Sequence, residues 1–119
     1  MIYGVGIDLV EIERVRAACE KEHFRERIFR PEELLEAGGR TRRLAADFAV
    51  KEAVSKALRT GFRGFGPWDI ACLRDEKGAP YVLLYGGAGE LSESLGIRRI
   101  HVSITDTDSQ VMALAVAEM

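Results

Sequence analysis

The sequence predicts a single α+β domain over residues 1–119, with an N-terminal strand, helices clustered early and antiparallel hairpins late. Apolar residues alternate at the start of the chain and again in its second half, as they do in half-buried strands. Between these parts they recur at helical spacing. Helical patterns that precede the hairpins favour α+β over a repeating βαβ order, and 119 residues suffice for one hydrophobic core.

The first predicted element is a strand over Met1–Leu9. Its alternation separates an apolar set from a set of small or acidic residues: Tyr3, Val5, Ile7 and Leu9 against Gly4, Gly6 and Asp8. We expect the apolar set to face the core and the other face to be bare backbone that ends at a carboxylate. Because glycine weakens a strand, the two glycines indicate that something approaches the backbone closely beside Asp8.

Three helices are predicted next. The first covers Val10–Glu22, where apolar residues recur every three or four positions. The second begins at Pro31, a favoured first helical residue, carries glutamates in its first turn and ends at Gly38. The third and longest helix runs from Thr41 to about Arg59.

The second half of the chain predicts two hairpins and a short helix. A glycine-rich loop after Gly61 leads to a hairpin of Trp68–Leu73 and Tyr81–Tyr85, and a helix over Ala88–Leu95 follows. The second hairpin joins Arg99–Thr105 to Gln110–Val116. Alternation in its first strand places three apolar residues inward and three polar ones on the opposite face: Ile100, Val102 and Ile104 against His101, Ser103 and Thr105.

Composition excludes several classes of protein. Hydrophobic residues make up 47% and charged residues 30%, which excludes a disordered chain. The longest apolar run, Val111–Ala117, is far shorter than the roughly 20 residues of a membrane span, and no signal-peptide pattern opens the sequence. We therefore expect a cytoplasmic protein with no membrane partner. The net charge of −2 argues against nucleic acid as a partner, and Cys19 and Cys72 lack the spacing of a metal site.

The third helix carries the residues with the clearest chemical potential. Phe48, Glu52 and Lys56 lie on one ridge at i, i+4 spacing, with Ser55 beside them. Glu52 and Lys56 taken alone form an ordinary helix-surface ion pair. Small alanines around Phe48 and a polar Ser55 favour a ligand site instead, because they leave room along the helix.

Asp8 and Glu52 together suit a divalent cation. Taken alone, Asp8 is explained by default as a capping or turn-making carboxylate at the end of a strand. Two carboxylates from separate elements, with Lys56 nearby, fit a Mg²⁺ ion that also binds a phosphate. Mg²⁺ usually binds only one or two protein carboxylates, and its other coordination positions are filled by water and substrate oxygens. His101, Ser103 and Thr105 either surround such a substrate or form a solvent-facing sheet surface.

Three motifs in order resemble those of the 4′-phosphopantetheinyl transferases, and most closely the short holo-acyl-carrier-protein synthases. They are Gly6-Ile7-Asp8-Leu9-Val10, the helix segment Phe48 to Leu58, and His101-Val102-Ser103-Ile104-Thr105. The resemblance covers the whole chain and includes Gly78-Ala79-Pro80-Tyr81 in the first hairpin. It implies the fold of that family and a homotrimer with active sites at subunit interfaces.

The resemblance also implies an activity. The family transfers the phosphopantetheine arm of coenzyme A to a serine of apo acyl carrier protein, requires Mg²⁺, releases 3′,5′-ADP and supports fatty acid biosynthesis. By position, Asp8 and Glu52 match metal ligands, and Lys56 matches the group that neutralises the diphosphate. Further candidates for contact with coenzyme A are Lys51, Ser55, Gly61 and His101. Two positions depart from the family pattern: Asp47 stands where Arg is frequent, and Asp106 where His is frequent.

The same resemblance places carrier-protein docking on a basic segment. The matching residues are Arg14, His23, Phe24 and Arg27, joined by Arg25. The chain as a whole is acidic, but this segment is basic and therefore suits an acidic partner. The alternative interpretation is that these residues form only a solvent-exposed charged surface. Two other functions remain open: a non-catalytic oligomerising or carrier-binding domain, and a different coenzyme A-dependent transferase.

Overall fold

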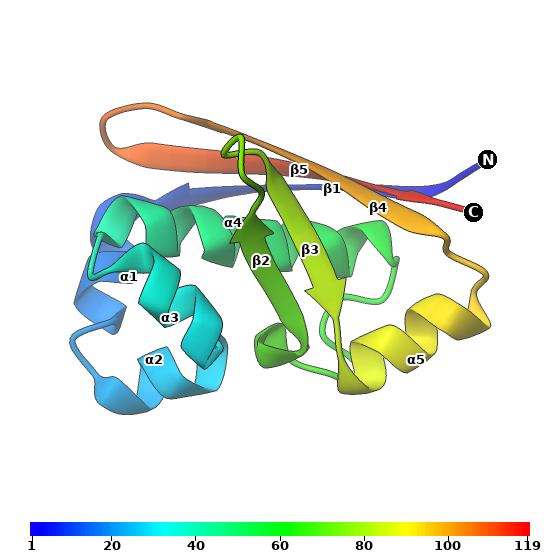
Figure 1. The fold of residues 1–119 in the computed structure, drawn as a ribbon, viewed down its shortest axis with the longest axis horizontal. Helices are drawn as coiled ribbons and strands as arrows, with labels where there is room; N and C mark the ends of the chain where they lie inside the picture. Colours follow the sequence, from blue (N-terminus) through cyan, green and yellow to red (C-terminus); the bar gives the residue numbers. More distant parts are fainter.

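A computed structural model describes all residues, 1–119, as one long helix packed under a three-stranded antiparallel sheet (Figure 1). A two-stranded sheet and four shorter helices surround the other sides of the long helix (Figure 1). This arrangement confirms the α+β class. None of its helices is long and apolar enough to cross a membrane.

The helices and strands follow the predicted order. The helical elements are α1 (Ile12–Ala18), α2 (Glu22–Ile28), α3 (Pro31–Ala37), α4 (Thr41–Ala57), the 3₁₀ turn η1 (Pro67–Asp69) and α5 (Gly86–Ser94). The strands are β1 (Ile2–Glu11), β2 (Ile70–Arg74), β3 (Pro80–Leu84), β4 (Arg99–Asp106) and β5 (Gln110–Glu118). The larger sheet has the order β1-β5-β4, and β2 pairs with β3 in the smaller one. Both predicted hairpins are confirmed.

The prediction for the faces of β1 was wrong, because the glycine face is the one that packs on α4. A Cβ at Gly6 would overlap the carbonyl oxygen of Ala53, and one at Gly4 would overlap that of Ala57. The close approach that the glycines indicate is therefore made by the long helix itself. Val5, Ile7 and Leu9 lie on the opposite face and are 55%, 56% and 60% exposed.

That opposite sheet face is apolar and uncovered in one copy of the chain (Figure 1). Across the strands, Ile7 pairs with Leu114, and Leu9 pairs with Met112. Leu114 and Met112 are also exposed. A contiguous apolar face on a small domain is typical of an interaction surface.

The predicted first helix is two helices in the structure. β1 continues to Glu11, so α1 begins only at Ile12, and a separate α2 follows after residue 21. Both are seven residues long and lack a side-chain N-cap hydrogen bond. Helices this short depend on tertiary packing, and Phe24 of α2 provides it by packing on Phe48 of α4 with ring centroids 6.3 Å apart.

The core forms where α4 meets the larger sheet. Small residues of α4, among them Ala49, Ala53 and Ala57, are fully buried. They face alternate residues of β5, which are also buried: Val111, Ala113, Ala115 and Ala117. Small side chains on both surfaces let helix and sheet approach closely, which holds the mid-helix residues against β1.

Candidate active site

A cavity of about 530 Å³ lies where β1 ends, between α1, α2 and α4. Both predicted metal ligands, Asp8 and Glu52, line it. Phe48 also contributes, as do Arg14 of α1 and Phe24 of α2. The structure therefore brings the predicted carboxylates and part of the predicted docking segment to one place.

Lys56 lies beside Asp8. Its ammonium Nζ donates to the backbone oxygen of Ile7 at 3.0 Å and to Asp8 Oδ1 at 3.2 Å. The Lys56 side chain is 51% exposed, whereas that of Asp8 is 17% exposed. The lysine is thus anchored to β1 while its charge remains accessible to a ligand.

Glu52 carries an unfavourable charge in this setting. Burial raises the pKa of Glu52 above its ordinary value, the charge of Asp8 raises it further, and Lys56 partly opposes both. Two carboxylates close enough to repel each other are stabilised by a cation placed between them.

The two carboxylates suit a hard divalent cation that keeps free coordination positions for water and substrate. Asp8 and Glu52 supply carboxylate oxygens, and no group of three or more metal-binding side chains exists in the protein. Such a pair cannot build a closed cage. It matches Mg²⁺, which binds through one or two carboxylates and completes its octahedron with water and substrate phosphates.

Lys51 and Ser55 lie inside the protein. Lys51 is fully buried, and its three ammonium donors reach Glu33 Oε1 at 2.8 Å, Pro67 O at 3.0 Å and Ile70 O at 2.5 Å. Ser55 Oγ donates to the backbone oxygen of Glu52 at 2.7 Å. This burial does not fit direct contact with a ligand, and it gives Lys51 the structural task of joining α4 to α3 and β2.

His101 lies on the other side of the larger sheet from Asp8. It shares the exposed face of Ile7, as Ser103 and Thr105 do, and its Nε2 is 2.9 Å from Glu118 Oε1. Within one copy of the chain these residues cannot surround a ligand at Asp8. Gly61 lies in the loop after α4 with a φ of 63°, and its N–H donates to the oxygen of Ser55.

Residues of the predicted docking segment differ in how free their side chains are. Arg25 donates through Nη1 to the backbone oxygen of Cys19, which ties α2 to the end of α1. Arg14 and Arg27 are exposed and make no ion pair, and His23 is exposed as well. Phe24 is partly buried and joins this surface to the Asp8 cavity.

A second cavity, of about 430 Å³, contains a cluster of basic residues that the sequence did not reveal. It lies between the start of α4, the β2–β3 turn and β4. We call it the four-arginine cavity, after Arg40, Arg42, Arg43 and Arg74 on its walls. Three of these arginines are neighbours in the sequence, but Arg74 comes from a distant segment, so no local pattern could have shown that it joins them.

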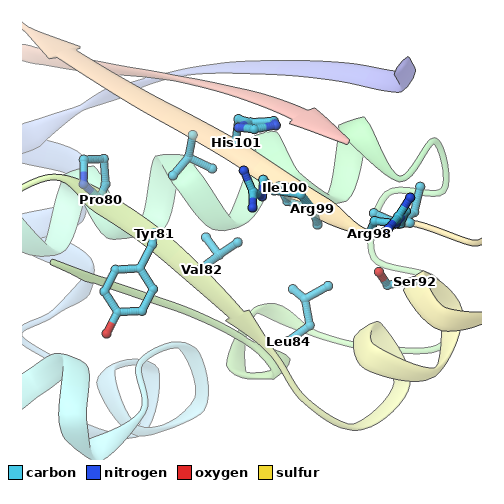
Figure 2. A pocket seen from close by; sticks show the side chains of 11 residues that line it. Pro80, Tyr81, Val82, Leu84, Ser92, Arg98, Arg99, Ile100 and His101 are labelled. Atoms are coloured by element: carbon cyan, nitrogen blue, oxygen red, sulfur yellow. The ribbon is translucent and has the colours of Figure 1, made fainter. Parts of the chain in front are cut away.

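A third cavity, of about 510 Å³, lies between β3, α5 and β4 (Figure 2). Val82 and Leu84 line it from β3, and Ser92 lines it from α5 (Figure 2). Arg98, Arg99 and His101 are its basic residues. It shares Pro80 with the four-arginine cavity, so the two openings are neighbours along the space between the two sheets.

Comparisons with known proteins agree on one family. The family model for the 4′-phosphopantetheinyl transferase superfamily matches residues 4–115. The holo-[acyl-carrier-protein] synthase of Lachnoclostridium phytofermentans is 45% identical over all of this chain and 98% of its own length.

Solved structures extend the agreement to the fold. The crystal structure of holo-[acyl-carrier-protein] synthase from Neisseria meningitidis is 38% identical, with a TM-score of 0.91 and complete coverage of both chains. That of the Helicobacter pylori enzyme in complex with coenzyme A is 30% identical, with a TM-score of 0.84 over 96% of this chain and 99% of that one. This protein therefore belongs to the 4′-phosphopantetheinyl transferase superfamily.

Proposed function

We propose that this protein is a holo-acyl-carrier-protein synthase, which transfers the 4′-phosphopantetheine arm of coenzyme A to a serine of apo acyl carrier protein. The observation that carries the proposal is the meeting of Asp8 and Glu52 at one cavity, with the ammonium of Lys56 in contact with Asp8. Holo carrier protein and 3′,5′-ADP are the products. We further propose that the reaction supports fatty acid biosynthesis and that the protein acts in the cytoplasm.

The chemistry of the transfer explains the residue types. The serine hydroxyl attacks the β-phosphate of coenzyme A, a P–O bond forms, and the bond to the departing 3′,5′-ADP breaks. Negative charge grows on the oxygens of the transferred phosphate and the leaving phosphate. The exposed ammonium of Lys56, held by Ile7 O and Asp8, is oriented to stabilise this charge.

Asp8 and Glu52 would hold the Mg²⁺ ion. A bound divalent cation supplies Lewis-acid stabilisation of the phosphate oxygens. Burial raises the pKa of Glu52, and the charge of Asp8 raises it further. A divalent cation bound between the two carboxylates would offset both effects, which supports this assignment. No residue of the cavity is assigned as a general base.

The mass of the carrier protein separates this function from its alternatives. Apo acyl carrier protein is incubated with coenzyme A, Mg²⁺ and the protein, and its intact mass is then measured. We expect a gain equal to one phosphopantetheine arm. A carrier-binding module leaves the mass unchanged, and an acyltransferase supplied with acyl-coenzyme A adds only the acyl group.

A homotrimer with active sites between subunits accounts for two features of the single chain. The apolar sheet face is open to solvent, and His101 lies on it, away from Asp8. If this face packs against another copy, the apolar surface is buried and His101 can reach the Asp8 cavity of a neighbour. The proposal keeps His101 and Gly61 as candidates for contact with coenzyme A.

Charge placed on the apolar face should break the assembly. Ile7→Glu is expected to convert the oligomer to monomers and to reduce transfer strongly, because a buried unpaired carboxylate opposes association. Analytical ultracentrifugation and the transfer assay measure the two effects. Leu35→Glu is the control, because Leu35 is 83% exposed on α3, outside this face. An Ile7→Glu protein that stays trimeric and active would contradict the proposed interface.

Carrier protein docks, in our proposal, on the exposed basic residues of α1 and α2. Arg14 and Arg27 are free of ion pairs, His23 is exposed, and Phe24 offers an apolar surface beside the cavity. Arg25 contributes by holding α2 in place through Cys19. Arg14 lines the cavity itself, so docking and chemistry meet at this residue.

Reversing two of these charges should weaken docking selectively. Arg14→Glu with Arg27→Glu is expected to raise KM for carrier protein at low salt, with a smaller difference from wild type at high ionic strength, because rim charges act through screened attraction. KM for coenzyme A should change little. The control is Arg63→Glu with Lys77→Glu, which makes the same change in net charge elsewhere. An unchanged KM for carrier protein at low salt would show that Arg14 and Arg27 are only a solvated face.

A further inference from the structure

The third cavity lies where the two sheets come close to each other without pairing (Figure 2). β3 belongs to the smaller sheet, β4 forms one edge of the larger sheet, and no ladder of hydrogen bonds joins them. The cavity, of about 510 Å³, occupies the space between these strands and extends to α5. Cavities of this size are typical of sites for small molecules.

The long sides of this cavity are apolar. They are lined by Val82 and Leu84 from β3 and by Ile100 and Val102 from β4. These side chains pack against the hydrophobic core, yet each of them is only partly buried. Because the strands do not close on each other, apolar surface on the inner side of both sheets remains open to the cavity. A ligand that covers this surface gains the free energy of removing it from water.

A hydroxyl group without a partner lies at the α5 end of the cavity. Ser92 lines the cavity and is only 9% exposed (Figure 2). Its Oγ makes no hydrogen bond within the chain, whereas Oγ of Ser94, on the same helix, donates to the backbone oxygen of Leu91 at 2.8 Å. Nearly buried polar groups normally have hydrogen-bond partners. Ser92 therefore has a donor available for a ligand in the cavity.

A cation without an ion pair lies at the same end. The N–H of Ile97 donates to the backbone oxygen of Ser92 at 3.0 Å, so the residue before Arg98 is held against α5. The N–H of Arg98 donates to the backbone oxygen of Glu118 at 2.8 Å, whereas its guanidinium makes neither an ion pair nor a hydrogen bond. No acidic residue lines the cavity. This end of the cavity therefore favours an anion.

We propose that the third cavity binds an amphipathic anion, an apolar chain that ends in a carboxylate or a phosphate. The chain lies between β3 and β4, and the anionic group contacts the guanidinium of Arg98 and the hydroxyl of Ser92, because a guanidinium fork matches either group. Pro80 to Leu84 covers about 13 Å of strand, which a medium-length chain such as that of decanoate spans when extended. The third cavity shares no residue with the Asp8 cavity, so this proposal does not depend on the proposed function.

Calorimetry with the full chain compares four ligands that share one chain length and differ in the end group: decanoate, decyl phosphate, decanol and decyltrimethylammonium. All are used below the concentrations at which they form micelles. We expect at least one of the two anions to bind at one site per chain, and the alcohol and the cation to bind at least about tenfold more weakly, equivalent to about 1.4 kcal/mol. The tighter anion identifies the end group. Decanol or the cation binding as tightly as the anions would overturn the proposal.

Variants test the two ends of the contact separately. Arg98→Gln should lower affinity for the anion about tenfold and leave the weak binding of decanol unchanged. Val82→Phe fills the cavity without a change in charge and should abolish binding of both. Arg63→Gln is the control, because it removes the same charge from an exposed side chain outside the cavity. Arg98→Gln changes an exposed side chain, so it decides the question even if the filled variant does not fold. Wild-type affinity in Arg98→Gln, or an equal loss in Arg63→Gln, would refute the proposed site.

Nuclear magnetic resonance locates the bound anion. The apolar sheet face is the other surface on which an apolar chain could settle, and Ile7 reports on it. Titration of decanoate into ¹⁵N-labelled protein should shift the backbone amide signals of Leu84, Ser92 and Ile100, with those of Ile7 and Glu52 unchanged. Shifts centred on Ile7 would show unspecific contact with the sheet face, and shifts centred on Glu52 would place the ligand in the Asp8 cavity. Either result would contradict the assignment of the third cavity.

Discussion

Asp8→Ala and Glu52→Gln are each expected to lower Mg²⁺-dependent transfer by roughly 10²- to 10³-fold, because each removes one of the two carboxylates that we propose hold the metal. Steady-state kinetics across a Mg²⁺ titration measures the loss. The remaining activity should need a higher Mg²⁺ concentration. Near-normal turnover with an unchanged Mg²⁺ dependence in either variant would refute the assignment.

Both variants should stay folded, so the loss can be read as chemistry. Asp8→Ala removes an ion pair with Lys56, whose side chain is half exposed, and a pair with one solvent-exposed partner contributes about 0–1 kcal/mol. The pKa of the Glu52 carboxyl group is raised by burial and by the charge of Asp8. Glu52→Gln removes the Glu52 charge and therefore relieves its repulsion with Asp8. The matched control is Glu11→Gln, which changes an exposed carboxylate on the same cavity and should leave transfer intact.

The raised pKa of Glu52 also gives the pH dependence a direction. A carboxyl group must lose its proton to bind Mg²⁺. Because the pKa of Glu52 is raised, the apparent Mg²⁺ affinity should begin to fall on acidification at a higher pH than it would with a glutamate of ordinary pKa. Glu52→Gln should lack this component. Measuring the Mg²⁺ concentration for half-maximal activity between pH 5 and pH 8 checks both statements.

Lys56→Ala is expected to lower kcat and kcat/KM together, by roughly 10²-fold or more. The ammonium lies against Asp8 and Ile7 O with half of its side chain exposed, so its charge is available where phosphate charge develops. Because that charge grows in the transition state, its loss should affect the chemical step more than substrate binding. Lys77→Ala, in the exposed β2–β3 turn, is the control. A change confined to KM for coenzyme A would make Lys56 a binding residue only.

Much of the fold could be predicted from periodicity. The long helix at Thr41–Ala57 and the inward set Ile100, Val102 and Ile104 follow from clear patterns over many residues. The short α2 escaped prediction because seven residues without a side-chain cap leave little signal. Its existence depends on the contact between Phe24 and Phe48, which sequence spacing does not show.

The inverted faces of β1 have a specific physical cause. Apolar alternation normally marks a core-facing surface, but here Gly4 and Gly6 admit the backbone of α4, and the apolar side chains face outward. A prediction from one chain assigns all apolar surface to one core. In the proposed homotrimer this exposed set contacts further copies, and apolar alternation does not distinguish such an interface from the core of one chain.

Site residues that stand in short sequence motifs could be predicted. Contacts between residues that are far apart in the sequence could not. Asp8, Glu52 and Lys56 could be named from local spacing, and the structure brings them to one place. Lys51 stands in the same helix motif but is buried with Glu33, eighteen positions away. Likewise, Arg40, Arg42 and Arg43 stand together in the sequence, but Arg74 joins them and meets Asp47 through folding alone.

Product stoichiometry tests the central claim most directly. Wild-type protein, coenzyme A and apo carrier protein are combined with Mg²⁺, with a chelator, and with Mg²⁺ restored after chelation. Mass spectrometry counts the modified carrier while chromatography counts 3′,5′-ADP in the same samples. We predict equal amounts of holo carrier protein and 3′,5′-ADP, both lost on chelation and both recovered when Mg²⁺ returns. Release of 3′,5′-ADP without carrier modification, or transfer that persists under chelation, would contradict the account.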